Sequence, residues 1–240
     1  MRYGIFGDVH SNLQALEAVT TALEAVGVDR LICLGDLVGY GADPAPCLDR
    51  VRELDPYLVG GNHDWGVADR LSLTYFNPVA RAAIEWTRAA LPPEAVAWLG
   101  SLEITGMAGE HIALAHSTVH DPHLFEYLVT PYDAYLSFRH LTTDLAFVGH
   151  SHVPATFFDG NPVTPVYETE VELAGRRAIA NVGSVGQPRD GNPEAAFGVY
   201  DEETGRLSIQ RIAYDVDAAA ARIREVGLPP ILADRLHLGR

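Results

Sequence analysis

Five short motifs contain most of the aspartate, asparagine and histidine side chains that could bind a metal ion or act on a substrate. In chain order they are Asp8-Val9-His10, Gly35-Asp36, Gly61-Asn62-His63-Asp64, His116 and Gly149-His150-Ser151-His152. Each motif follows a short apolar run that is typical of a buried strand. Because the carboxyl ends of neighbouring parallel strands meet at one rim of a sheet, we expect these side chains to converge there.

The number of candidate ligands predicts two metal ions. They form two sets that share one bridging aspartate: Asp8, His10, Asp36 and His152, and then Asp36, Asn62, His116 and His150. A mixed nitrogen and oxygen donor set suits Mn, Fe, Co, Ni or Zn better than Ca or Mg alone. Two divalent ions with a bridging hydroxide would leave the site with a net charge of about +1, which favours a phosphate ester as the ligand. Two-metal centres stabilise both the attacking and the leaving oxygen in a phosphoryl displacement.

Any one of these residues could instead have a purely structural role. Aspartate and asparagine cap helices and turns, and a histidine can be a hydrogen-bonded member of the core. A single Asp-x-His pattern is therefore weak evidence for a metal site. Five such motifs in order, each at the end of an expected strand, are poorly explained by structural roles alone.

Composition restricts the chemistry and the partners of the chain. All 17 basic residues among the 240 are arginine, which excludes a P-loop, a protein kinase and a Schiff-base enzyme because each needs a lysine. The formal charge of −15 opposes strong nucleic-acid binding. The apolar runs are strand-sized, so we expect no membrane span. Two cysteines, Cys33 and Cys47, favour a reducing cytoplasm over a disulfide framework.

The elements that would position the motifs alternate between strands and helices in the first part of the chain. Strands are expected over residues 3–6, 30–34, 56–59, 111–115 and 145–148, and then over 165–174, 176–182, 196–201 and 206–212. Helices are expected between a cap at Ser11 or Asn12 and Gly27, from Asp43-Pro44 onward, and over 77–90, 92–99, 131–141 and 215–226, the last closing the chain. This pattern predicts one α/β domain spanning residues 1–240, with a pair of sheets and helices outside them.

The motif series resembles the calcineurin-like metallophosphoesterase superfamily over residues 4 to about 155. A second segment, residues 181–191, is similar to the segment that follows the last metal motif in the small bacterial phosphodiesterase branch. The resemblance implies a four-layer α/β/β/α sandwich of two mixed sheets, a dinuclear centre with the ligands named above, and His63 as the catalytic histidine. Ser117 stands where the family commonly has glycine, and Ser151 where it often has threonine.

Further residues are candidates for contact with a substrate. Arg189 could bind phosphate oxygens, or it could pair with Asp190 or remain solvated. His120 could line the pocket because it follows His116 closely. Three tyrosines could stack on a nucleobase or belong to the core: Tyr127, Tyr132 and Tyr135.

We therefore predict a cytoplasmic, metal-dependent hydrolase of small phosphate esters, with manganese as the preferred metal. Phosphodiesters are the first choice of substrate. A bridging hydroxide would attack phosphorus, and His63 would protonate the leaving oxygen or stabilise its charge. Two alternatives remain, namely a phosphomonoesterase acting on nucleotides or phosphoproteins, and a non-catalytic metal-binding scaffold. The residues predict no particular oligomeric state.

Overall fold

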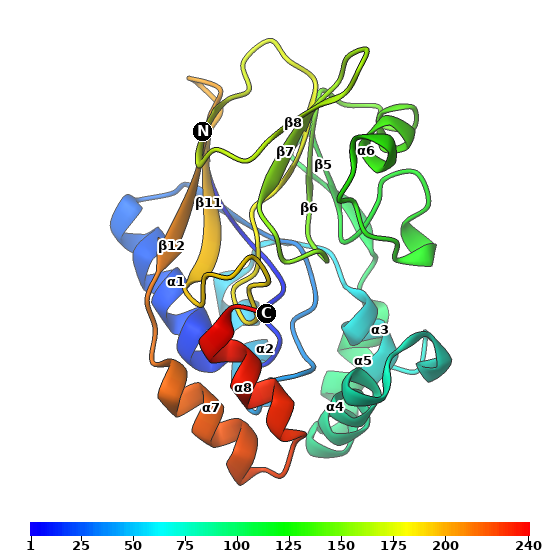
Figure 1. The fold of residues 1–240 in the computed structure, drawn as a ribbon, viewed down its shortest axis with the longest axis vertical. Helices are drawn as coiled ribbons and strands as arrows, with labels where there is room; N and C mark the ends of the chain where they lie inside the picture. The colour runs from blue at the N-terminus through cyan, green and yellow to red at the C-terminus, as the bar shows by residue number, and fades with distance from the viewer.

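Two mixed sheets of six strands each form the centre of the protein in a computed structural model that describes residues 1–240 (Figure 1). In spatial order, the first sheet contains β3 (Tyr57–Leu58), β2 (Arg30–Cys33), β1 (Arg2–Phe6), β11 (Ala195–Asp201), β12 (Arg206–Ile212) and β9 (Glu170–Glu172). The second sheet contains β4 (Thr105–Ala108), β5 (Ile112–Ala115), β6 (Leu145–Val148), β10 (Ala178–Asn181), β7 (Ala155–Phe158) and β8 (Thr164–Val166).

The strands that lead into the predicted motifs are the parallel ones. In the first sheet β1 is parallel to β2, and β2 is parallel to β3. In the second sheet β6 is parallel to both β5 and β10. Their carboxyl ends therefore share a direction within each sheet, which is the condition under which the following loops can form one site. The remaining strand pairs are antiparallel.

Helices cover the outer faces of the two sheets (Figure 1). Near the first sheet lie α1 (Leu13–Val26), α2 (Pro44–Leu54), α7 (Val216–Glu225) and α8 (Pro230–Leu238). Beyond the strand ends, α3 (Asn62–Val67) packs on α4 (Pro78–Ala90) and α5 (Pro93–Ser101). On the second sheet lies α6 (Pro131–Phe138). The result is the expected α/β sandwich of two sheets with helices outside. No helix combines the length and the hydropathy of a transmembrane segment.

Three buried hydrophobic clusters correspond to the three interfaces between the layers. Strand β6 shows how one short sequence supplies two of them. Leu145 and Phe147 pack between the two sheets, whereas Ala146 and Val148 pack beneath α6. Alternate side chains of a strand point to opposite faces, so an uninterrupted apolar run is buried on both sides.

Helix α1 begins and ends where the sequence predicts. The Asn12 side chain accepts a hydrogen bond from the amide of Ala15 at 3.1 Å, and Gly27 ends the helix in the left-handed conformation. This cap fixes the turn between β1 and α1, which carries Asp8 and His10.

The expected elements in the last third of the chain need correction. The segment 165–174 is not one strand, because β8 belongs to the second sheet and β9 to the first. The helix over 215–226 does not close the chain, because α8 follows it after the Pro229-Pro230 pair, with a proline in its first turn. Strands β4 and β7 were not predicted from the sequence.

Candidate metal centre

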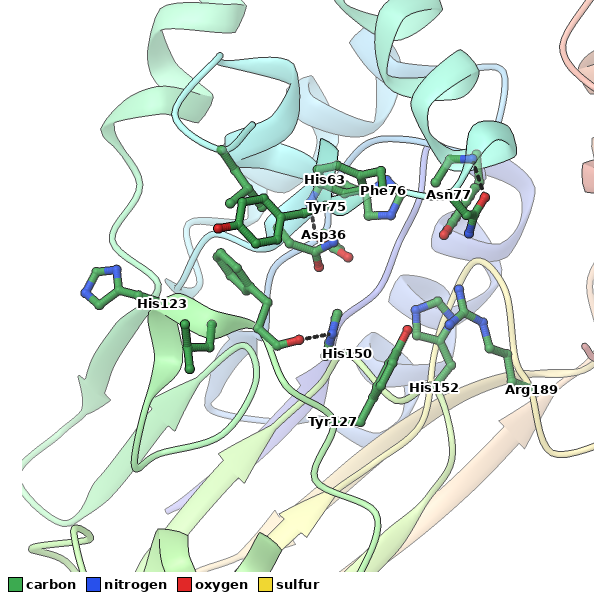
Figure 2. A pocket seen from close by; sticks show the side chains of 16 residues that line it. Asp36, His63, Tyr75, Phe76, Asn77, His123, Tyr127, His150, His152 and Arg189 are labelled. Atoms are coloured by element: carbon green, nitrogen blue, oxygen red, sulfur yellow. Dashed lines mark hydrogen bonds between the residues drawn. The ribbon is translucent and has the colours of Figure 1, made fainter. Parts of the chain in front are cut away.

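The structure brings the predicted metal-binding side chains together at the carboxyl ends of the parallel strands. They form two groups in which the ligand atoms lie within 4.8 Å of one another: Asp8, His10, Asp36 and His152, and then Asp36, His116 and His150. All of these side chains are buried. Asp36 belongs to both groups, as expected of a bridging ligand. It occupies the middle of the site in Figure 2.

Asn62 joins the second group through its amide oxygen. It is the first residue of α3, and its Oδ1 lies 3.2 Å from Nε2 of His116. The preceding Gly61 is needed for this approach, because a Cβ at that position would collide with the Asp36 carboxylate. A tight contact between the loops after β2 and β3 therefore sets the position of Asn62.

Main-chain carbonyls orient three of the four candidate histidine ligands in the same way. The Nδ1 atoms of His10, His116 and His152 lie 3.1, 2.7 and 2.6 Å from the carbonyl oxygens of Val38, Leu34 and Gln187. Each Nδ1–H donates to its carbonyl, which leaves the Nε2 lone pair directed into the site. This is the usual outer-sphere arrangement of metal-binding histidines.

His150 uses the opposite ring nitrogen. Its Nε2–H donates to the carbonyl oxygen of Phe125 at 2.8 Å, so Nδ1 is the atom left for a metal. The Phe125 carbonyl comes from the loop between β5 and α6. This loop therefore helps to build the site although it contains no predicted ligand after His116.

Lone pairs that face each other across the site favour a cation between them. Nε2 of His10 and Nε2 of His152 are only 3.1 Å apart, although neither carries a proton when both rings donate through Nδ1. The Asp8 carboxylate lies 3.3 Å from the same His152 nitrogen, and the Asp36 carboxylate lies 3.4 Å from Nε2 of His116. Buried acceptors pointing at one another are unfavourable unless a positive charge lies between them. This donor set therefore fits divalent metal ions.

Burial also prepares the imidazoles to bind metal. It lowers the pKa of His10, His150 and His152 below the usual value, which keeps these rings neutral at neutral pH. In His116 burial acts in the same direction, but the neighbouring Asp36 carboxylate outweighs it and raises the pKa to about 9. A metal bound at His116 would have to displace that proton.

The ligand turns have an unusual backbone conformation that the sequence did not predict. Asp8, His10, Asp36, His150 and His152 have φ values of 50°, 49°, 50°, 68° and 61°. The metal-binding residues of the Asp-x-His and His-x-His pairs therefore lie outside the extended region of the backbone. A left-handed residue other than glycine costs about 1–3 kcal/mol and persists where the surroundings determine it, as happens at functional sites.

His63 lies beside the metal-binding groups but has a different environment. It is the second residue of α3, and its amide donates to Oδ1 of Asp36 at 2.8 Å. Its ring centroid lies 4.4 Å from that of Tyr40 and 5.3 Å from that of Phe76. Nδ1 is buried without a hydrogen-bond partner, against Gly39. Burial lowers the pKa of His63 to about 4.

Asp64 follows His63 directly but does not hydrogen-bond to its ring. Its carboxylate accepts hydrogen bonds from three main-chain amides, those of Leu37, Val38 and Gly61, at 2.9, 3.2 and 2.9 Å. Asp64 therefore ties α3 to the loop that carries Asp36. The carboxylate is also fully buried, and burial raises its pKa to about 7.

A pocket opens over the second metal-binding group and contains both polar and aromatic residues (Figure 2). Its lining includes the candidate ligands Asp36, Asn62, His150 and His152, together with His63, Arg189, Tyr40, Tyr75, Phe76, Phe125 and Tyr127. A buried cluster of metal-binding side chains at the floor of an open pocket is typical of a hydrolytic metal site.

Residues 1–205 match the family model of the calcineurin-like phosphoesterase superfamily domain. The chain therefore belongs to this superfamily. It is also 38% identical over 242 residues to an uncharacterized protein of Methanocaldococcus jannaschii, with 98% of this chain and 97% of the relative covered.

Solved structures agree with membership of the phosphoesterase superfamily. A metallophosphoesterase from Sphaerobacter thermophilus is 39% identical and superposes with a TM-score of 0.89, covering 100% of this chain and 99% of its own. A hypothetical protein from Pyrococcus horikoshii shares the fold with a TM-score of 0.79 at 19% identity, over 100% of this chain and 98% of its own. The chain is thus a hydrolase that acts on phosphate esters.

Arg189 faces the pocket of this phosphoesterase without a carboxylate partner. Its Nη2 donates to Oε1 of Gln187 at 3.2 Å, and its Nε is buried with no partner. Asp190 instead pairs with Arg211, so the predicted alternative of an Arg189–Asp190 ion pair is wrong. The guanidinium is therefore available to an anionic ligand.

His120 and two of the candidate tyrosines lie outside the phosphoesterase pocket. The His120 ring bonds to the Ser137 hydroxyl of α6 at 3.0 Å and does not line the cavity, which corrects the prediction that it forms the pocket wall. Tyr132 and Tyr135 are exposed on α6 and do not line it either. Tyr127 does line it, in the loop before α6.

The segment 181–191 stabilises the turns that carry the candidate ligands through side-chain hydrogen bonds. This structural role gives a physical reason for the resemblance of the segment to other phosphoesterases. The Ser184 hydroxyl donates to the carbonyl oxygen of Asp8 at 2.9 Å. The side-chain amide of Asn181 donates from Nδ2 to the carbonyl oxygen of Gly149 at 2.6 Å and to the Ser151 hydroxyl at 3.0 Å. These contacts hold two of the strained turns, and motif spacing alone could not assign them.

Proposed function

We propose that this phosphoesterase hydrolyses phosphodiesters with the help of two divalent metal ions, within a single domain spanning residues 1–240. The observation that carries the proposal is the position of Asp36, which belongs to both groups of candidate ligands. When bound, such ions activate water and stabilise the negative charge of the phosphoryl group. Manganese is the proposed metal, and Fe, Co, Ni and Zn suit the same donors.

The chain's own residues would divide the remaining tasks. Arg189 would bind a non-bridging phosphate oxygen, because its guanidinium faces the pocket without an acidic partner. His63 would donate a hydrogen bond or proton to the leaving oxygen from the side of the pocket that Phe76 and Tyr40 enclose. The seven candidate ligands would hold the metals.

The lining of the pocket favours diesters over monoesters. Arg189 is its single arginine, and half of its sixteen lining residues are hydrophobic. A phosphomonoester carries close to two negative charges at neutral pH, whereas a diester carries one charge and a second organic group. One guanidinium and an apolar wall suit the diester better. Both cysteines are buried and unpaired, which is compatible with a reducing cytoplasm.

Metal removal and two model substrates test the proposal. We expect extensive chelation to abolish hydrolysis of bis-p-nitrophenyl phosphate and added Mn²⁺ to restore it, because the candidate donors converge in two buried groups that fit divalent ions. The metal-loaded protein should hydrolyse this diester faster than p-nitrophenyl phosphate. Preference for the monoester would replace the diesterase assignment by the phosphatase alternative. No turnover of either ester, or of a nucleotide panel, would favour the metal-binding scaffold.

Substitution of Arg189 tests its role in binding phosphate. We expect Arg189→Ala mainly to raise KM and to lower kcat/KM roughly 10- to 150-fold, because a charged hydrogen bond contributes about 1.5–3 kcal/mol. Metal content should be unchanged, since Arg189 is not among the clustered ligands. Arg139→Ala is the matched control, because Arg139 ends α6 and lies outside the pocket. Equal kcat/KM for wild type and Arg189→Ala on every substrate would assign Arg189 a structural role.

A further inference from the structure

The aromatic ring of Tyr127 forms a platform beside the metal-binding groups. It is nearly parallel to the imidazole of His150, with an angle of 13° and 4.4 Å between ring centroids. His150 therefore covers one face of the Tyr127 ring. The residue is nevertheless half exposed and lines the pocket, with its hydroxyl end turned toward the site in Figure 2. His150 is the only aromatic ring stacked on Tyr127, and half of the residue's surface is exposed, which leaves the ring face opposite His150 for a ligand.

We propose that the platform binds a nucleobase, so that the substrate is a small nucleoside phosphodiester. This inference rests on the proposed phosphodiesterase function and specifies the organic group next to phosphorus. A base on the free face of Tyr127 would extend the stack that His150 and Tyr127 already form. Arg189 lines the same pocket and would hold the phosphate of such a molecule.

The loop before α6 holds the platform in place before any ligand arrives. The carbonyl of Phe125 accepts the hydrogen bond from His150, and the Phe125 side chain packs edge-to-face on Trp65 with 5.8 Å between centroids. Leu128, the residue after Tyr127, is buried in the cluster beneath α6. A ring anchored on both sides loses little conformational freedom when a ligand stacks on it, which favours binding.

The rest of the pocket favours a base over an alkyl group. Tyr75 is three-quarters exposed on the short helix η1 (Leu73–Tyr75), and Phe76 follows it, so other aromatic residues line the same cavity. Stacking tolerates any base because every base has a π-face. The formal charge of −15 and the absence of lysine oppose a long nucleic-acid strand. A mononucleoside diester offers a base for stacking and carries only one negative charge.

Two esters with the same leaving group test the inference: thymidine 5′-(p-nitrophenyl phosphate) and methyl p-nitrophenyl phosphate. For the Mn²⁺-loaded protein we expect kcat/KM to be roughly 5- to 150-fold higher for the nucleoside ester, which corresponds to about 1–3 kcal/mol of stacking. Tyr127→Leu should bring this ratio close to one. Tyr127→Phe should keep the ratio, because it retains the ring.

The control variant is Tyr132→Leu, which removes an exposed tyrosine of α6 that lies outside the pocket and should leave the ratio as in wild type. Metal content is measured for every variant, because Tyr127 also touches a candidate ligand. Equal losses on both esters in Tyr127→Leu would mean that the ring only supports His150, and would overturn the inference. A wild-type ratio near one would also overturn it while leaving the phosphodiesterase function intact. No hydrolysis of either ester would overturn that function and the inference together.

Discussion

Replacing Asp36 with alanine is expected to leave fewer than two metal ions per chain and to lower kcat by roughly 10³-fold or more. Its carboxylate belongs to both groups of candidate ligands, with Oδ2 at 3.4 Å from His116 and 3.6 Å from His10. Without it, two positive ions would face each other with no shared anion. Metal ions in such centres supply several kcal/mol of charge stabilisation, which corresponds to the expected loss in rate.

Asp36 also has a structural contact, so a second variant is needed. Its Oδ1 accepts the hydrogen bond from the His63 amide, and Asp36→Asn can retain that bond while removing the negative charge. We expect Asp36→Asn to keep the fold and still lose metal. Asp49→Ala is the control, because Asp49 is an exposed aspartate of α2 away from the pocket. Elemental analysis, thermal unfolding and kcat are measured on each variant. Two retained ions with full activity in Asp36→Ala would refute the bridging role.

The candidate ligands could be predicted from the sequence because their signals are local. Each follows a short apolar run that forms a parallel strand, and parallel strands direct the residues after them to one rim. Asp8 after β1, Asp36 after β2 and His150 after β6 all follow this rule. The bounds of helix α1 were equally predictable, because its cap Asn12 and the terminating Gly27 have well-defined preferences.

Contacts between distant segments could not be predicted in this way. Tyr40 packs against both His10 and His63, and its left-handed conformation depends on the surrounding loops. The loop before α6 presents Phe125 and Tyr127 to the site, although neither belongs to a motif. His120 was predicted to line the pocket because it is close in sequence to His116. The chain turns toward α6 after His116, so the His120 ring bonds to Ser137 instead. Such positions depend on long-range packing, which residue spacing does not encode.

Replacing His63 with alanine should separate catalysis from metal binding. The His63 ring lines the pocket but is absent from both groups of clustered ligand atoms, so we expect both metals to be retained. Its Nδ1 has no acceptor, which favours the tautomer that carries the proton on Nε2. Because burial lowers its pKa to about 4, the ring is neutral at neutral pH; it would donate a hydrogen bond from Nε2 and give up the proton only as negative charge develops on the leaving oxygen. Loss of a general acid typically lowers kcat about 10²- to 10⁴-fold, and we expect a loss in this range for a poor leaving group such as a nucleoside alkoxide.

The leaving group identifies what His63 contributes. p-Nitrophenolate departs without a proton, so His63→Ala should lose much less kcat on a p-nitrophenyl ester than on an ester with an alkoxide leaving group. His120→Ala is the matched control, since this histidine bonds to Ser137 outside the pocket and should leave both rates unchanged. Metal content and kcat are measured with both kinds of ester. Equal losses for the two leaving groups would exclude proton donation and leave charge stabilisation as the role. A missing metal ion in His63→Ala would instead make His63 a ligand, because a residue that only faces substrate has no means of holding an ion.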